Sequence, residues 1–235
     1  MTWSLIARDV SGAFGIAVAT KNFAVGCRVP FISSRVGAIA TQALVNPFYG
    51  VHGLNFLEDE MPPADIIKML TEGDEGRDQR QVHMMDRHGR IAAHTGKACV
   101  DWCGHTSGEG YSVAGNMLAG ADVIAQTAKT YVANSALPFP RRLISALKAG
   151  EAAGGDKRGR QSAALVIYGE EEWPDLDLRV DDHTDPLAEL ERLEKVSRER
   201  WVHFRQFLPT RKNPAGITDR DIIDAGIEAA VAGNR

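Results

Sequence analysis

The stretch Thr2-Trp3-Ser4-Leu5-Ile6-Ala7-Arg8, followed by Phe14-Gly15-Ile16-Ala17-Val18-Ala19-Thr20, decides the fold of this 235-residue chain. Both runs are mostly apolar and the residues between them, 9–13, are rich in turn formers, so residues 4–8 and 14–20 predict a β-hairpin. The second run and a similar one at 37–41 do not alternate apolar with polar residues, which predicts strands buried on both faces. The sequence therefore favours a layered interior.

The rest of the chain predicts strands and helices in an α+β order rather than a regular βαβ alternation, so a Rossmann fold is not expected. Residues 186–208 predict one long amphipathic helix, and a capped helix is expected after Thr218. The other predicted helices are 53–60, 63–71, 121–134 and 140–149, the last of them ended by Gly150, and the other predicted strands are 81–86, 90–94, 110–114, 162–168 and 176–180.

The composition is that of a folded globular protein, with 44% hydrophobic and 25% charged residues. A net charge of -4 with both signs interspersed gives no basic footprint for nucleic acid. Arg8 and Asp9 interrupt what would otherwise be the apolar core of a signal peptide, and no run is long and apolar enough to span a membrane. Three cysteines leave one thiol unpaired, which favours a reducing compartment. We therefore expect a cytoplasmic protein that acts on a small molecule, not on nucleic acid or a membrane.

Several short motifs occur together in this chain. They are residues 2–9, Ala40-Thr41-Gln42-Ala43 with Asn46-Pro47, Ala93-His94-Thr95-Gly96, Gly115-Asn116-Met117-Leu118, the run at 154–164 and Leu178-Arg179-Val180-Asp181-Asp182-His183. By these motifs, which span about residues 2–190, the chain resembles the bacterial family called domain of unknown function 1028.

The resemblance implies an Ntn-hydrolase-like fold: a four-layer αββα sandwich of two antiparallel sheets between helical layers, with no established reaction. We expect this domain to cover residues 1–186. A helical C-terminal extension, 187–235, is expected to pack on the domain or on a second subunit, and a homodimer is one hypothesis.

Thr2 is the first candidate for catalysis. Ntn hydrolases use the side chain of an N-terminal Thr, Ser or Cys as nucleophile and its own α-amine as base. Thr2 would supply both groups once Met1 is removed. In a chain that keeps Met1 the Thr2 nitrogen is an amide and not a base, and the alternative interpretation is a threonine that only begins a strand.

Four further polar residues follow predicted strands. Lys21 and Gln42 each follow a buried Ala-Thr pair, so adjacent pairing of their strands would bring both to one rim, where Lys21 would lower the pKa of a nucleophile. His94, followed by Thr95, is a candidate acid or base, and Asn116 a candidate oxyanion donor. In the alternative interpretations, Lys21 is a solvated lysine, His94 is a core or turn histidine and Asn116 is a turn residue.

The run at 154–162 predicts substrate binding, because its glycines let backbone N–H groups approach an anion while arginines supply charge. Its candidate residues are Asp156, Arg158, Arg160, Gln161 and Ser162, and Asp181 and His183 are expected to support them from behind. In the alternative interpretation it is a tight solvated turn in which Asp156 pairs with Arg158 or Arg160.

We expect no cofactor and no resident metal ion. The glycine run lacks the Gly-Lys-Ser/Thr order of a Walker loop, and the C-x3-C pair Cys99 and Cys103 has no second zinc knuckle. The leading functional hypothesis is hydrolysis of an amide or related C–N bond in a small, anionic substrate. Its rivals are a non-catalytic ligand-binding or assembly protein and an enzyme that uses His94, Asn116 and Asp156 without Thr2.

Overall fold

The predicted N-terminal hairpin lies at the centre of a six-stranded sheet in the computed structural model, which describes residues 2–233. This first sheet has the strand order β10-β9-β2-β1-β8-β7, the second has the order β3-β4-β5-β6, and all neighbours are antiparallel. The strands are β1 (Thr2–Arg8), β2 (Phe14–Thr20), β3 (Pro30–Ser33), β4 (Gly37–Ala43), β5 (Arg80–Asp86), β6 (Ile91–Thr95), β7 (Trp102–Gly108), β8 (Tyr111–Leu118), β9 (Ser162–Tyr168) and β10 (Leu176–Val180).

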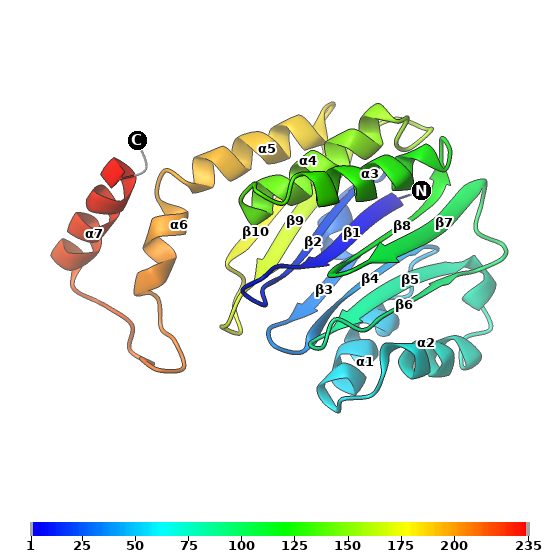
Figure 1. The fold of residues 1–235 in the computed structure, drawn as a ribbon, viewed down its shortest axis with the longest axis horizontal. Coiled ribbons are helices and arrows are strands. Elements are labelled where there is room, and N and C mark those ends of the chain that lie inside the picture. Colours follow the sequence, from blue (N-terminus) through cyan, green and yellow to red (C-terminus); the bar gives the residue numbers. More distant parts are fainter. Residues whose placement is uncertain (1, 234–235) are drawn as a thin grey trace.

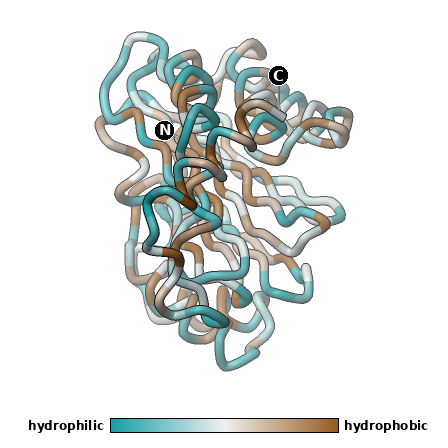
Figure 2. Tube along the Cα trace, turned by 90° about the vertical axis from the view of Figure 1, so that its left-hand side faces the viewer, coloured by the Kyte–Doolittle hydropathy of each residue, from teal (hydrophilic) through white to brown (hydrophobic). Residues whose placement is uncertain are grey.

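Helices cover the outer face of each sheet, so the predicted four-layer α+β sandwich is confirmed (Figure 1). α1 (Pro47–Glu58) and α2 (Pro63–Glu72) pack on the second sheet, and α3 (Asp122–Ala133), α4 (Phe139–Ala152) and α5 (Pro186–Ser197) pack on the first. Hydrophobic segments gather in the interior and hydrophilic ones in the outer loops (Figure 2).

The first strand shows why both faces of the sheet are apolar. Trp3 and Leu5 pack among helices α3 and α4, while Ile6 packs between the two sheets with residues of β4 and β5. Each side chain is almost fully buried, which stabilises the fold by about 1.5–3 kcal/mol per large apolar residue. The expectation of strands buried on both faces is therefore confirmed for β2 and β4 as well.

Several predicted boundaries are wrong. The strand expected at 110–114 is the longer β8, and β3 and β7 were not predicted, because β7 is a glycine-containing edge strand with no apolar alternation. The helix expected at 53–60 already begins at Pro47, where the Asn46 side chain accepts the Phe48 N–H as an N-cap. Gly150 does not end α4 but lies inside it, where a side chain would clash with Thr127 of α3.

The single helix predicted over 186–208 is also wrong. α5 ends at Ser197, and a short helix α6 (Trp201–Phe204) follows in a new direction, continued by a 3-10 turn (Arg205–Phe207). Leu187 and Leu190 are fully buried against the first sheet, whereas Trp201 lies beyond it and is partly exposed. The apolar pattern of the sequence continues past Ser197, but the first sheet offers these later side chains no surface on which to pack.

The final helix, α7 (Arg220–Gly233), packs on α6 and lies to one side of the sandwich (Figure 1). α5 thus packs on the domain, while the division at 186/187 and the homodimer remain predictions. Over residues 2–233, no helix has the length and hydropathy needed to cross a bilayer.

Truncation of single side chains tests how far the core extends into the C-terminal segment. We expect Leu190→Ala to lower the free energy of unfolding by roughly 2–5 kcal/mol, because Leu190 is fully buried in the core. The matched control is Ile222→Ala on α7, where the side chain is 56% exposed and the loss should stay below about 0.5 kcal/mol. Equal losses in urea unfolding would show that this division of the core is incorrect.

Candidate functional site

One end of the sandwich gathers most of the predicted site residues. β1 begins there at Thr2, opposite Asn116 of β8, and β2 ends there at Thr20, beside Lys21. Gln42, near the end of β4 in the second sheet, reaches the same inter-sheet space. We call this region the Thr2 end.

Lys21 and Gln42 do not meet through strand pairing, so that expectation is wrong. β2 and β4 belong to different sheets, and each is paired with other strands. Gln42 is buried between the sheets, whereas Lys21 is exposed and its Nζ donates to the Arg160 carbonyl over 3.1 Å.

A buried hydrogen-bond network joins the two sheets next to the Thr2 end. Gln42 Nε2 donates to Gln81 Oε1 (2.8 Å) and to the Ala114 carbonyl (3.1 Å), and Gln81 Nε2 donates to Thr95 Oγ1 (2.9 Å) and to the Gly115 carbonyl (2.8 Å). Gln42 and Gln81 are almost completely buried, so these bonds replace those that the amides would make with water. The network ties β4 and β5 to β8.

His83 contacts two serines, Ser4 and Ser112, among the described side-chain hydrogen bonds, but the geometry is structural. Ser4 Oγ donates its proton to Gln42 Oε1 (2.7 Å), so it accepts from His83 Nε2 (2.8 Å). His83 Nδ1 then accepts from Ser112 Oγ (2.8 Å). Burial, and secondarily the charge of His105, lowers the pKa of His83 to about 3. The pair is inaccessible and neutral, and it has no spare lone pair with which to activate a nucleophile.

Thr2 and Asn116 lie next to this network. Asn116 Nδ2 donates to Gln81 Oε1 (3.0 Å) and to the Thr2 carbonyl (3.4 Å), and Thr2 Oγ1 donates to Thr20 Oγ1 (3.2 Å). Both are buried at the ends of rigid strands. The structure therefore links Thr2, Asn116 and Gln42 through hydrogen bonds that run by way of Gln81, and their catalytic and binding roles stay predictions.

A cavity of about 350 Å³ opens beside Asn116 at the Thr2 end. We call it the Asn116 cavity, and its lining is Ala43, Leu44, Gln79, Ala98, Cys99, Val100, Asn116 and Met117. Leu44 and Val100 are 58% and 55% exposed, so the walls carry apolar side chains that solvent can reach. None of the described residues that line it is Asp, Glu, Lys or Arg, which suits an uncharged group.

Two residues that line the same cavity have strained backbone. Ala43 and Met117 both have left-handed backbone, with φ of 69° and 54°. Such a conformation costs a residue with a side chain about 1 kcal/mol or more and collects at functional sites. The Leu44 N–H donates to the Gln79 carbonyl (3.1 Å) and the Met117 N–H to the Val100 carbonyl (3.0 Å), and these bonds hold the strained ends of β4 and β8 in place.

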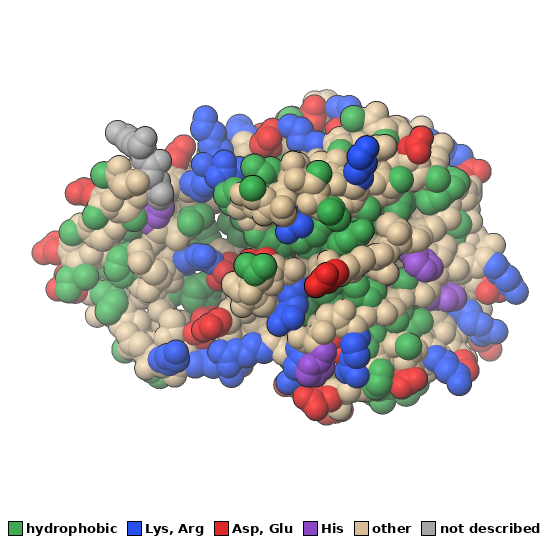
Figure 3. Space-filling view, in the orientation of Figure 1, with side chains coloured by type: hydrophobic (Ala, Val, Ile, Leu, Met, Phe, Trp, Pro, Cys, Tyr) green, Lys and Arg blue, Asp and Glu red, His purple; other side chains and the backbone are tan. Residues whose placement is uncertain are grey.

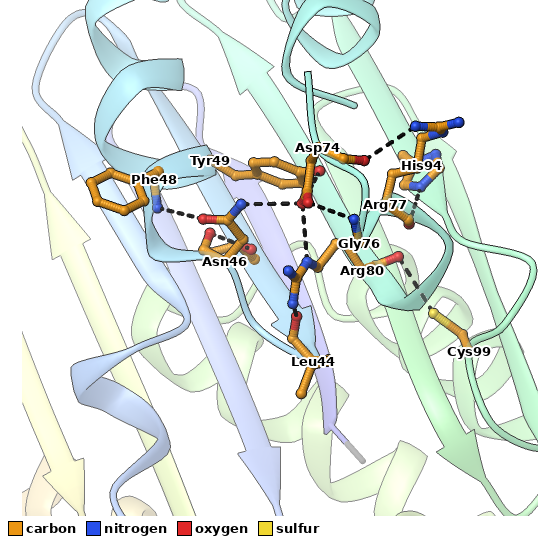
Figure 4. Close-up of polar contacts among 11 residues, drawn as sticks. Leu44, Asn46, Phe48, Tyr49, Asp74, Gly76, Arg77, Arg80, His94 and Cys99 are labelled. Carbon is orange, nitrogen blue, oxygen red and sulfur yellow. Dashed lines mark hydrogen bonds and ion pairs between the residues drawn. The ribbon is translucent and has the colours of Figure 1, made fainter. Parts of the chain in front are cut away.

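Asp74, in the loop after α2, supports the rim of the Asn116 cavity (Figure 4). Its carboxylate accepts from Arg80 Nε (3.0 Å), Tyr49 Oη (2.8 Å) and Asn46 Nδ2 (3.2 Å), and Arg80 Nη1 also donates to the Leu44 carbonyl (2.6 Å). Burial alone would raise the pKa of Asp74, but the bonds from Arg80 and Tyr49 outweigh it and hold that pKa well below its usual range. Asn46 is therefore a positioning residue here and not a wall of the cavity.

The glycine-rich run at 154–162 uses its charges within the chain. Asp156 Oδ2 accepts the Lys21 N–H (2.7 Å), Asp156 also pairs with Arg158 (3.2 Å), and Lys157 pairs with Asp101. Arg160 pairs with Glu151 and with Asp185, both at 3.2 Å. This arrangement favours the interpretation of the run as a tight turn, with Asp156 bound to Arg158.

The residues after this turn hold strand ends together. The Gln161 N–H donates to the Thr20 carbonyl (3.1 Å), the His183 N–H donates to the Gln161 carbonyl (2.8 Å), and Ser162 Oγ accepts the Val25 N–H (3.1 Å). Asp181 pairs with Arg179 at 2.9 Å. These contacts fasten β2, β9 and β10 beside the Thr2 end.

His94 does not share a hydrogen-bond partner with Asn116. Its Nε2 bonds to the Arg77 carbonyl (2.9 Å). Thr95 instead joins the inter-sheet network, where its hydroxyl bonds to Gln81 and to His105 Nδ1 (3.0 Å). The structure gives His94, Asn116 and Asp156 separate partners, so it brings no acid–base group of these three together.

Sequence reasoning missed Gln81, His83, Asp74 and Arg80. A signal was present for the first two, because polar residues at alternate positions of a mostly apolar strand must face one side together. Asp74 lies in a loop without a motif and Arg80 begins β5, and only the tertiary structure shows their partners.

The pH dependence of stability tests whether His83 is held neutral. Its pKa of about 3 lies below the ordinary value of 6.5, so between these values the unfolded chain binds the extra proton. The contribution of neutral His83 to stability is therefore complete above about pH 6.5. It is lost as pH falls toward 3, by up to about 1.4 kcal/mol per pH unit. We expect His83→Gln to remove this part of the slope in urea unfolding.

The control for this measurement is His52→Gln, at an exposed histidine of α1, which should keep the wild-type slope. If His83→Gln and wild type show the same slope, a protonated His83 is tolerated in the folded chain and the assigned network is wrong.

A second prediction concerns Asp74 and Arg80, whose side chains are only 15% and 18% exposed. We expect Asp74→Asn to destabilise the chain by roughly 3 kcal/mol, because it leaves Arg80 without its counter-charge. Glu72→Gln, which breaks the exposed pair with Lys68, should cost less than about 0.5 kcal/mol. A double-mutant cycle with Arg80→Gln that shows additive losses would contradict this coupling.

Comparison with known proteins places the chain in a family. No curated protein matches it. Residues 2–190 match the family described as a family of unknown function, DUF1028. The crystal structure of protein SPO2555 from Silicibacter pomeroyi, labelled with the same family, is similar over 93% of this chain and 96% of that chain, with 34% identity and a TM-score of 0.85. The chain therefore belongs to the DUF1028 family, as its motifs predicted.

Proposed function

We propose that this protein hydrolyses an amide or related C–N bond in a small molecule, with Thr2 as nucleophile after removal of Met1. The observation that supports the proposal most is the position of Thr2, which heads a central strand and pairs with Asn116, a residue that lines the Asn116 cavity. Two antiparallel sheets between helices are also what an Ntn-hydrolase-like fold requires. Fold likeness alone is a weak warrant for activity, so the proposal depends on this site.

The mature N-terminus supplies both the nucleophile and the base of the reaction. Thr2 Oγ1 attacks the carbonyl carbon while the free α-amine of Thr2 takes the hydroxyl proton. Collapse of the tetrahedral intermediate breaks the C–N bond, and the leaving amine receives that proton. Water then attacks the Thr2 ester, which releases the acid and restores the hydroxyl. Asn116 Nδ2 donates to the Thr2 carbonyl (3.4 Å) and to Gln81 Oε1 (3.0 Å), and it is our candidate for stabilising the oxyanion, for which it exchanges the longer of these two bonds.

The substrate that the site favours carries an uncharged acyl group. Among the described residues that line the Asn116 cavity, Cys99 has the only ionisable side chain, and burial raises the pKa of that thiol, which favours its neutral form. The arginines on which an anionic substrate was predicted are paired within the chain. We therefore propose that the substrate has the expected amide or related C–N bond, and that its acyl group is neutral and partly apolar rather than anionic.

The cellular location and the oligomeric state remain proposals. The described cysteines are all free thiols, which supports a reducing, cytoplasmic location. A homodimer formed through the C-terminal helices stays a hypothesis, and light scattering of the chain with and without residues 209–235 tests it.

Thr2→Ala and Thr2→Ser are the decisive variants. We expect intact mass to show loss of Met1, and we expect wild type to release amine from a member of a library of acylated amino acids, dipeptides and lactams. Thr2→Ala should lower the rate by roughly a thousandfold or more, whereas Thr2→Ser keeps a hydroxyl and stays active. Thr218→Ala, at a distant exposed threonine, is the control.

Full activity of a chain that keeps Met1, or of Thr2→Ala, would overturn the proposal. Binding of a library member without turnover, unaffected by Thr2→Ala, would support the rival view of a non-catalytic ligand-binding protein.

A further inference from the structure

The opposite end of the sandwich carries a second cavity, which has a different chemistry from the Thr2 end. β1 ends there at Arg8, and the β3–β4, β5–β6 and β9–β10 turns lie around it (Figure 1). The cavity has a volume of about 600 Å³, and its cationic walls are Arg8, Arg35 and Arg87, with His88 and Ser11 beside them. We call it the Arg8 cavity. Lys and Arg side chains gather with a histidine over these turns (Figure 3).

Arg8 is not ion-paired with any carboxylate of residues 2–233. It forms none of the salt bridges of the described chain, and its Nε is buried without a hydrogen-bond partner. Its guanidinium lies over the Phe14 ring, with Cζ 5.8 Å from the ring centroid, which fixes the side chain without neutralising it. An unpaired guanidinium in this setting is a site prepared for an external acceptor.

The neighbouring carboxylate does not neutralise Arg8. Asp9 Oδ1 accepts from the Ser11 N–H (2.9 Å), Ser11 Oγ (2.6 Å) and the Ala13 N–H (3.1 Å), so it closes the turn between β1 and β2. Its role is local, and the turn it builds forms one wall of the cavity.

Arg35 contributes a second cation to the same cavity. It lies in the turn between β3 and β4 with left-handed backbone (φ 62°), is exposed, and forms no ion pair in the described part of the chain. Arg87 pairs only with the exposed Glu60, at 3.5 Å. Guanidinium groups that share one cavity repel each other, and a bound anion removes that repulsion.

We propose that the Arg8 cavity binds a small molecule through a carboxylate or phosphate group. Arg is suited to both, because its planar fork donates two parallel hydrogen bonds to such oxyanions. Glu170 and Asp175 also line the cavity, and Asp175 is already paired with Arg205. These carboxylates favour a ligand with one anionic group over a polyanion such as nucleic acid. The site does not depend on Thr2 or on any hydrolytic activity.

The test measures binding of inorganic phosphate and of acetate, separately, by calorimetry and by the shift in melting temperature of the full chain. We expect wild type to bind one of the two probes and to melt at a higher temperature in its presence. Arg8→Gln and Arg35→Gln should each weaken that binding by roughly tenfold or more. Arg35 is exposed in a turn, so its variant reports on binding even if Arg8→Gln folds poorly.

The controls are Arg220→Gln, at an exposed arginine of α7, and Arg160→Gln in the glycine-rich turn, and both should bind like wild type. Three results would overturn the site: no binding of either probe at millimolar concentration, binding that is unchanged in both Arg8→Gln and Arg35→Gln, or binding lost only in Arg160→Gln. The difference between phosphate and acetate identifies which oxyanion the cavity prefers.

Discussion

The structure depends on the requirement that polar groups buried between the two sheets be fully hydrogen-bonded. Gln42 extends from the second sheet and bonds at once to Ser4 of β1, Gln81 of β5 and the Ala114 carbonyl of β8. An amide buried without these partners would cost about 1–3 kcal/mol for each unsatisfied group. A shift of β4 by one residue would turn Gln42 to the outer face, so the network fixes the register of one sheet against the other.

The same network limits which groups can perform chemistry. His83 bonds to hydroxyls through both ring nitrogens, and Ser4 gives its only proton to Gln42, so the serine–histidine pair stabilises the interior and has no access to substrate. Under the proposed function, the reactive groups therefore lie where the network ends. At that border the strands terminate, the backbone is strained at Ala43 and Met117, and the Asn116 cavity opens. The proposed nucleophile, Thr2, is at this border, and the buried pair is not.

The sequence predicted the layers better than it predicted the site. The unbroken apolar runs of β2 and β4 require cover on both faces, and that reasoning depends only on local pattern. β7 was not predicted, because its position is set by pairing with β8 and not by its own composition. Motifs mark Thr2 and Asn116 as candidates, whereas Asp74 acquires its role from Asn46, Tyr49 and Arg80, which lie up to 28 residues away in sequence. The charges of residues 154–162 were visible, but their partners Glu151, Asp185 and Asp101 were not.

β1 also connects the two ends of the molecule. Thr2 and Arg8 are the first and last residues of this strand, which puts them roughly 20 Å apart at about 3.4 Å per residue. Coupling between two sites requires an element with two arrangements, and β1 has no free face on which to rearrange, since helices pack on one side and the second sheet on the other. An anion at Arg8 would therefore stabilise the folded chain through the ends of β1 and β3 without reorienting Thr2. The physical role of such a ligand is to neutralise the charge at one end of the sandwich while the opposite end keeps the geometry set by Gln42 and Gln81.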